Sequence, residues 1–269
     1  MNLQETFGTD APVVGMVHLP PLPGAPRFDG DRQALRERML ADARALESGG
    51  VDGIMVENFG DAPFYPEDVP KHVVAEMASL GTELVDEVSV PVGINVLRND
   101  AEAALSVAAA VGADYVRVNA HVGATVTDQG LIEGTAHETM RLRDRLDADV
   151  AVLADVGVKH AAPLADRPMR EELVDAVERG LADGILVSGS GTGDPTDRSV
   201  LQTARETIDD AVPGTPLFVG SGVTAETVGE TLELADGVVV GTALKDGGET
   251  TNLVDETRVR SVVEAARSR

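Results

Sequence analysis

The chain has 269 residues, of which 43% are hydrophobic, so it has enough apolar material for a large buried core. It carries 46 Asp and Glu against 22 Lys and Arg, a formal net charge of −24. Such an acidic surface repels phosphate backbones and anionic lipid, which argues against nucleic acid and membranes as partners. The chain has no cysteine, so disulfides, thiolate metal sites and cysteine nucleophiles are excluded. No apolar run could span a membrane and no signal peptide is visible, so we expect a cytoplasmic protein.

The basic residues are almost all arginine, and Lys71, Lys159 and Lys245 are the lysines of the whole sequence. Many acidic residues, few lysines and many small aliphatic residues are typical of proteins adapted to high salt, where charge repulsion is screened. We therefore interpret the chain as halophilic and archaeal, with an ordinary acidic protein as the alternative.

Short apolar runs alternate along the chain with longer stretches of helical spacing. Near-continuous apolarity is typical of strands buried on both faces of a parallel sheet. The runs lie at 13–17, 53–56, 92–96, 115–118, 150–153, 184–187, 217–219 and 237–240. The helical stretches lie at 31–48, 73–87, 101–111, 137–146, 169–179, 198–209, 225–234 and 255–266. Eight such units predict an α/β protein, a TIM (β/α)8 barrel in which residues 1–269 form one domain. A doubly wound sheet is the alternative.

Polar residues follow the predicted strands, where barrels of this kind have their active sites. Glu57 ends an apolar strand, and a partly desolvated carboxylate there is suited to act as a general base. Its alternative is a structural acid paired with Arg117. For a second proton carrier we consider Asp155 together with His18 or His160.

Lys159 follows Asp155 by four residues and is interpreted as an electrostatic stabiliser of enolate charge, with a Schiff base as the weaker alternative. Asn95, Arg117 and Asn119 are expected to bind substrate. Two carboxylates with Asn95 or Asn119 could also hold Mg²⁺, but no H-E-x-x-H or comparable spacing supports a metal site. We therefore predict neither a metal site nor a cofactor.

Glycine-rich turns follow the last three strands. The pair Gly220-Ser221-Gly222 and Gly241-Thr242 predicts a phosphate site, because glycine lets the backbone approach an anion closely. Lys245 would add a positive charge there, or else be a solvated lysine. The loop after the sixth strand contains Ser188, Gly189, Gly191 and Gly193 and would be a lid or a second anion site. Phe59, Phe64 and Tyr65 could cap a ring of the substrate, although packing within their loop is the favoured interpretation.

Five motifs together resemble the BtpA family across essentially the whole chain: residues 14–26, 53–64, 154–161, 188–193 and 220–223. The resemblance implies a TIM-like barrel more firmly than it implies a reaction, because the family name comes from photosystem I biogenesis whereas members also occur in sugar-catabolism gene sets. Gly157 stands where the family has a second histidine, which weakens a metal site there.

These observations favour an enzyme acting on a small phosphorylated sugar or nucleoside-derived metabolite. Isomerisation, epimerisation and aldolase or lyase chemistry all require a proton transfer next to a carbonyl, together with a phosphate anchor. The alternatives are a non-catalytic assembly factor and a phosphometabolite sensor. The sequence leaves homo-oligomerisation open.

Overall fold

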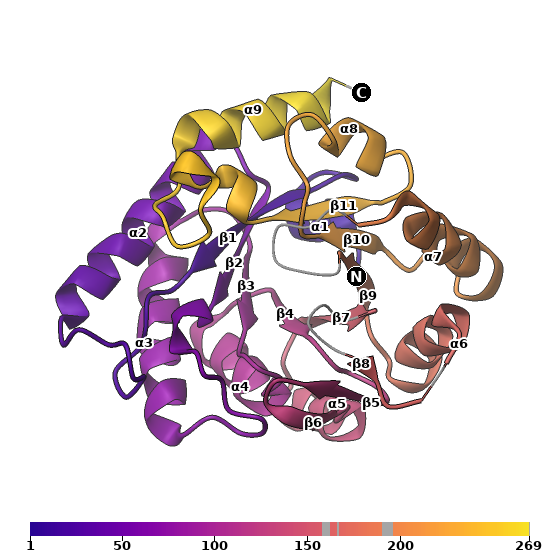
Figure 1. Cartoon of the computed structure of the whole chain (residues 1–269), viewed down its shortest axis with the longest axis horizontal. Coiled ribbons are helices and arrows are strands. Elements are labelled where there is room, and N and C mark those ends of the chain that lie inside the picture. The colour runs from indigo at the N-terminus through magenta and orange to yellow at the C-terminus, as the bar shows by residue number, and fades with distance from the viewer. Residues whose placement is uncertain (158–161, 166, 190–195, 269) are drawn as a thin grey trace.

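In the computed structural model, the chain is described over residues 1–157, 162–165, 167–189 and 196–268. Eight parallel strands close into a barrel in the order β1-β11-β10-β9-β7-β4-β3-β2 (Figure 1). Each of the eight predicted apolar runs forms one of these strands, which confirms the TIM barrel. The strands are β1 (Val13–His18), β2 (Gly53–Glu57), β3 (Val92–Asn95), β4 (Tyr115–Val118), β7 (Ala151–Val156), β9 (Gly184–Ser188), β10 (Leu217–Gly220) and β11 (Gly237–Val240).

Helices surround the barrel where the helical spacing predicted them (Figure 1). Asp31 caps the first of them by accepting hydrogen bonds from the backbone of Gln33 and Ala34. The helices are α2 (Arg32–Gly49), α3 (Lys71–Glu87), α4 (Ala101–Val111), α5 (Ala136–Arg145), α6 (Met169–Val174), α7 (Arg198–Ala211), α8 (Val228–Thr231) and α9 (Glu256–Arg267). A π-helical turn, η2 (Asp175–Arg179), continues α6.

One predicted helix is much shorter than expected. The sequence predicted a helix over 225–234, whereas α8 covers four residues. The side chain of Thr227 accepts a hydrogen bond from the backbone nitrogen of Thr224 at 3.0 Å. Threonine bonds of this kind hold the chain in a turn and compete with helix formation.

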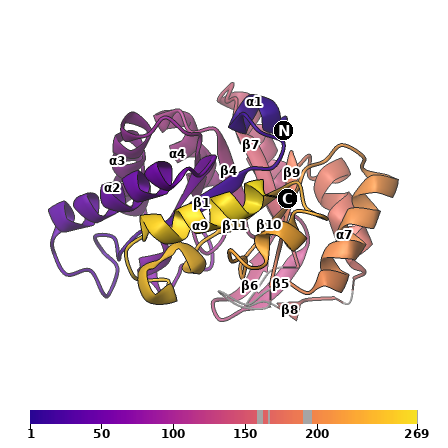
Figure 2. The same ribbon diagram turned by 90° about the horizontal axis from the view of Figure 1, so that it is seen from above.

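Two features outside the eight units were not predicted. A short helix, α1 (Leu3–Phe7), precedes the barrel, and a small antiparallel sheet combines β5 (Ala124–Thr127), β6 (Gly130–Glu133) and β8 (Ala162–Pro163). Figure 2 shows α1 at one end of the barrel and the small sheet at the other. The sheet extends the loops that follow β4 and β7, on the side where the strands end.

Aromatic side chains fill the barrel at the end where α1 lies. The ring of Phe7 packs against Tyr115 and Phe218, with centroids 5.5 and 6.2 Å away. The Tyr115 hydroxyl donates a hydrogen bond to the Ile54 carbonyl at 2.8 Å. Space for Tyr115 comes from Gly93, where an added Cβ would lie 2.1 Å from the tyrosine ring. This end of the barrel is therefore closed by apolar packing.

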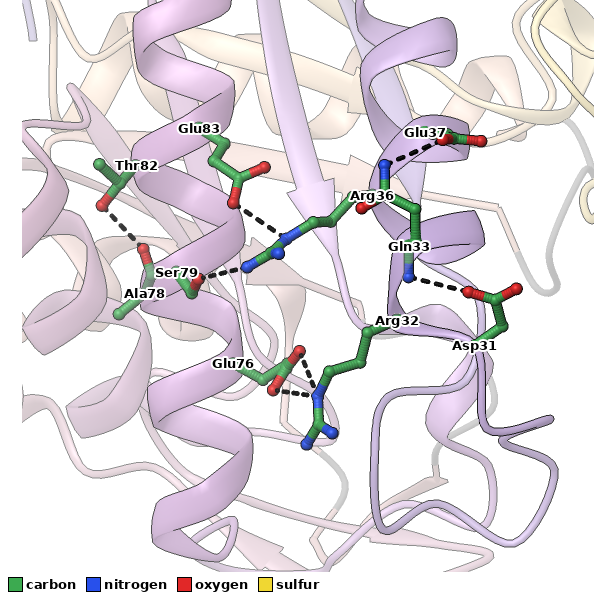
Figure 3. A network of polar contacts seen from close by, with 10 residues as sticks. All are labelled: Asp31, Arg32, Gln33, Arg36, Glu37, Glu76, Ala78, Ser79, Thr82 and Glu83. Carbon is green, nitrogen blue, oxygen red and sulfur yellow. Dashed lines mark hydrogen bonds and ion pairs between the residues drawn. The ribbon is translucent and has the colours of Figure 1, made fainter.

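The outer helices are joined by ion pairs between arginines and the abundant acidic residues. Figure 3 shows Arg32 and Arg36 of α2 reaching toward α3. Arg32 lies 3.3 Å from Glu76, and Arg36 lies 2.9 Å from Glu83. Arg36 also donates a hydrogen bond to the Ser79 hydroxyl at 3.1 Å. Among the helices of the described residues, none combines the length and apolarity needed to cross a membrane.

Candidate functional site

A cavity of about 510 Å³ opens where the barrel strands end. Its walls come from the ends of β1, β2, β4, β10 and β11, from the loops that follow β2 and β3, and from α9. The lining residues include His18, Glu57, Phe59, Phe64, Arg98, Arg117, Asn119, Gly220, Ser221, Gly222, Glu226, Gly241, Thr242 and Arg258. Many residues predicted from separate strands are thus brought to one cavity.

Glu57, Arg117 and Asp155 form a buried charged cluster across the barrel. Asp155 accepts hydrogen bonds from Arg117 at 2.9 and 2.7 Å and from the Asn119 amide at 2.9 Å. Arg117 lies 3.9 Å from a Glu57 oxygen, which is an ion pair but too long for a hydrogen bond. Within the described ranges, no hydrogen bond engages the Glu57 carboxylate, although its residue is only 6% exposed. Glu57 therefore borders the cavity with a carboxylate that no described hydrogen bond engages.

Arg117 is charged despite its burial. Burial opposes its charge, but the charge and hydrogen bonds of Asp155, together with the charge of Glu57, outweigh burial, so the pKa of Arg117 is raised. Asp155 is 4% exposed and does not itself line the described part of the cavity. Its oxygens accept bonds from Arg117 and Asn119, whereas its role as a proton carrier stays a prediction.

Arg98 is a second buried arginine on the cavity wall that the sequence analysis missed. It follows β3, and its residue is 6% exposed. Burial lowers the pKa of Arg98, and the negative charges of Asp155 and Glu57 act in the opposite direction. Arg98 lies three residues past Asn95 and places a cation beside Glu57. The sequence analysis missed it because no local pattern distinguishes Arg98 from a surface arginine.

His18 lies between the predicted phosphate loop and an aromatic ring. Its imidazole centroid is 4.9 Å from the ring of Phe59. On the other side, a Cβ added to Gly241 would lie 2.8 Å from His18 Cε1. Because β1 pairs with β2 in the register His18 to Glu57, the imidazole and the carboxylate lie on neighbouring strands. The two groups are thus adjacent candidates for moving protons.

The glycine turns after β10 and β11 form a continuous part of the wall. Gly220, Ser221, Gly222, Gly241 and Thr242 all line the cavity. Ser221 and Gly222 have φ angles of 71° and 66°. For serine this left-handed conformation is strained, and such strain is concentrated at functional sites. The three glycines of these turns therefore present backbone to the cavity.

Two charged residues beside these turns were not predicted. Arg258 of α9 lines the cavity, and its Nε donates a hydrogen bond to the Ala243 carbonyl at 2.8 Å. Glu226 also lines the cavity, and a hydrogen bond with Thr224 lowers the pKa of this exposed carboxyl. Arg258 lies 201 residues from Glu57 in the sequence, so only the closed barrel reveals that both serve one cavity.

Lys245 does not belong to this wall, contrary to the prediction. It is fully buried and donates a hydrogen bond to Asp42 of α2 at 3.0 Å. The other Asp42 oxygen accepts from the backbone of Val254 at 2.7 Å. Burial lowers the pKa of Lys245, opposed by the Asp42 charge. Lys245 is thus a structural cation that joins α2 to the segment before α9, neither a phosphate ligand nor a solvated lysine.

The remaining predicted residues are divided between buried positions and parts that are not described. Asn95 is 1% exposed and donates hydrogen bonds to the Arg117 carbonyl and the Asn119 amide oxygen. Neither Asn95 nor the buried Ser188 and Gly189 appear among the described residues that line the cavity. Lys159, His160, Gly191 and Gly193 lie outside the described residues.

Phe59 and Phe64 line the cavity and are only half-buried, which differs from the favoured interpretation that they pack within their own loop. Tyr65 is 44% exposed and does not line the described cavity wall. For metals, no group of three or more His, Asp or Glu side chains suited to hold an ion occurs among the residues that the structure describes.

Comparison with known proteins gives a family and a fold. The BtpA family matches residues 9–268 of the chain. The photosystem I biogenesis protein BtpA of Synechocystis sp. is 48% identical, over 98% of this chain and 91% of that protein. The putative sgc region protein SgcQ of Escherichia coli is 33% identical, over 97% of this chain and 96% of that protein.

Solved structures match the barrel at low sequence identity. Tryptophan synthase of Mycobacterium tuberculosis matches with a TM-score of 0.64 and 18% identity, over 99% of this chain and 98% of that chain. Thiamine phosphate pyrophosphorylase of Pyrococcus furiosus matches with a TM-score of 0.58 and 16% identity, over 99% and 98% of the two chains. Likeness at such identities establishes the shared fold alone.

Proposed function

The chain belongs to the BtpA family, and we propose that it is an enzyme that moves a proton next to a carbonyl group of a small phosphorylated metabolite. The observation that carries this proposal is the shared cavity. It joins the Glu57 carboxylate, which no described hydrogen bond engages, to the glycine backbone after β10 and β11. A base and an anion site in one cavity are what an isomerase or lyase of phosphorylated sugars requires.

The phosphate is held by the turns at Gly220–Gly222 and Gly241–Thr242, with Arg258 as the adjacent cation. Several matched structures support this choice by their names, which include a thiamine phosphate enzyme and an N-(5'-phosphoribosyl)anthranilate isomerase. Glu226 faces the same region and disfavours a fully charged phosphate, so backbone contacts and Arg258 must outweigh it.

The proton transfer uses the charged cluster on β1, β2 and β4. Glu57 removes the proton from the carbon beside the carbonyl, and His18 is the second proton carrier. Arg117, held by Asp155 and Asn119, and Arg98 stabilise the negative charge that develops on the carbonyl oxygen. Arg117 and Arg98 thereby take the role that the sequence analysis gave to Lys159.

Ligand binding is tested first, by thermal shift with inorganic phosphate, ribose 5-phosphate and glucose 6-phosphate, each with and without Mg²⁺. Molar KCl is the medium, because we interpret the −24 charge as an adaptation to high salt. A ligand at 100 times its Kd stabilises the folded state by about 2.7 kcal/mol. A flat response with an intact fold would overturn the proposal.

Proton transfer is tested by NMR in D2O, as deuterium incorporation beside the carbonyl of a sugar phosphate that binds. We expect Glu57→Gln to slow this exchange by about 100-fold or more while binding persists. Glu226→Gln is the matched control, since it removes a second acidic group from the same cavity. Equal exchange in Glu57→Gln and wild type would show that Glu57 is not the base. Binding without exchange in the wild type would identify a sensor instead.

A non-catalytic assembly factor is the second candidate, because one surface feature favours it. Val126 and Leu131 on the small sheet are 46% and 47% exposed, and Leu164, directly after β8, is 60% exposed. Val126 pairs directly with Leu131 across β5 and β6, so the two side chains share a face. An assembly factor needs an exposed apolar surface of this kind. Two results together would favour this candidate. The ligand screen would be flat, and Leu131→Ser would make the protein more soluble without changing its stability.

A further inference from the structure

The aromatic residues of this chain are few, and two of them lie on the cavity wall. The sequence has five Phe, two Tyr and no Trp. Phe7, Tyr115 and Phe218 are buried in the closed end of the barrel. Phe59 and Phe64 are instead half-buried and border the cavity. Their rings are therefore partly available to a ligand, because the protein covers them only in part.

The cavity is large and partly apolar for a ligand that consists only of a sugar and a phosphate. Its volume of about 510 Å³ lies in the range of pockets that enclose organic ligands with apolar parts. Beside the two phenylalanines, its walls include Met16, Leu97, Val223, Val239 and Val262. A sugar phosphate has only the small C–H face of its sugar with which to cover this part of the wall.

The arrangement of the strands gives the order of the parts of the ligand. Strand β1 lies between β11 and β2. His18 ends β1, Gly241 follows β11, and the loop with Phe59 follows β2. Neighbouring strands are about 4.8 Å apart, so the distance from the β11 turn to the β2 loop is about 10 Å. His18 stands between the two, against Gly241 on one side and Phe59 on the other.

We propose that the substrate carries an aromatic or heteroaromatic ring on its phosphorylated sugar, and that Phe59 and Phe64 bind this ring. The inference rests on the proposed function, because the phosphate bound at Gly241 and Gly222 sets the position of the sugar and of the ring. The sugar then lies under His18 and Glu57, and the ring reaches the two phenylalanines. Stacking and burial against these rings stabilise the complex without any further charge.

The test compares ligands that differ only by the ring. Ribose 5-phosphate is titrated beside adenosine 5'-monophosphate and uridine 5'-monophosphate in molar KCl, with binding followed by calorimetry. We expect the better of the two ring-bearing ligands to bind at least about tenfold more tightly than ribose 5-phosphate. Phe64→Leu should remove most of this difference and leave the affinity for ribose 5-phosphate unchanged. Phe59→Leu should also remove most of the difference, but it alters the packing of His18 and is read only as the ratio of the two affinities.

Phe28→Leu is the matched control, because Phe28 is also half-buried but lies against the core and away from the cavity. It should keep the tenfold difference. Equal affinities for ribose 5-phosphate and both nucleotides would overturn the ring proposal and leave the proposed function standing. If neither inorganic phosphate nor ribose 5-phosphate binds, the proposed function fails, and the ring proposal fails with it.

Discussion

The two ends of the barrel are built from the same strands but have opposite characters. Inward-facing residues recur every second position along a strand. On β4 the inward residues run from Tyr115 at the closed end to Arg117 at the cavity, and on β2 they run from Met55 to Glu57. The apolar layer and the charged cluster are thus only two residues apart along each strand. The residues that stabilise the barrel and the residues that line the cavity form successive layers of it.

The two layers differ in what they contribute to stability. Phe7, Tyr115 and Phe218 are at most 7% exposed, so their burial is nearly complete. In the other layer, Glu57, Arg117 and Asp155 are buried charges, and the desolvation penalty of such groups offsets much of their mutual attraction. The closed end therefore stabilises the fold, whereas the cavity end positions charged groups.

The largest difference should appear when a phenylalanine is truncated at each end. Phe218→Ala should lower the free energy of unfolding by about 3–5 kcal/mol, because it leaves a cavity in a fully packed layer. Phe59→Ala should cost about 1 kcal/mol or less, since Phe59 is half-buried. Urea unfolding in molar KCl measures both values. Equal losses would contradict the division of the barrel into a stabilising end and a binding end.

Lys245 offers the second test, because it is a charged residue near the cavity end that serves the fold. Lys245→Met should cost roughly 3 kcal/mol, since it leaves the Asp42 carboxylate buried without its cation. The double variant Lys245→Met with Asp42→Leu should recover part of the loss. Both are measured by urea unfolding in molar KCl.

The affinity for inorganic phosphate distinguishes this structural role from the predicted one. If Lys245 bound phosphate directly, Arg258→Gln and Lys245→Met would weaken phosphate binding by similar factors. We expect Arg258→Gln to have the larger effect, because Arg258 lines the cavity and Lys245 does not.

The repeating architecture was readable from the sequence, because it depends on local patterns. Each apolar run between helical stretches became a barrel strand, and Asp31 and Gly50 mark the ends of α2 as caps. The hairpin of β5 and β6 was missed although it had a signal, namely β-branched residues on both sides of Gly130. Glu57, His18 and the two glycine turns were found because they directly follow apolar runs, and Arg117 was found because it is a charged residue inside one.

Residues whose roles depend on distant partners could not be assigned in this way. Arg258 enters the cavity from the last helix, and its sequence neighbours give no sign of that position. Lys245 was misassigned because its partner, Asp42, lies 203 residues away. Asp155 was placed correctly at the end of a strand, but its hydrogen bonds to Arg117 and Asn119 depend on the pairing of β7 with β4, which the sequence does not show directly.

The smallest effect concerns His121, in the segment that follows β4 on the cavity side. Burial lowers the pKa of His121, and its hydrogen bond with the Gly180 carbonyl opposes this shift only in part. The unfolded chain, with an ordinary histidine pKa of about 6.5, therefore takes up a proton before the folded protein does. Stability is full above about pH 6.5 and falls below it, by at most about 1.4 kcal/mol per pH unit.

His121→Gln should reduce this acid-side loss, as measured by urea unfolding between pH 7.5 and 5.5. The exposed His137, changed to Gln, is the control and should leave the slope unchanged. The variants share every other titrating group, so the difference in slope belongs to His121 alone. A slope identical to that of the wild type would mean that His121 accepts its proton as easily when folded.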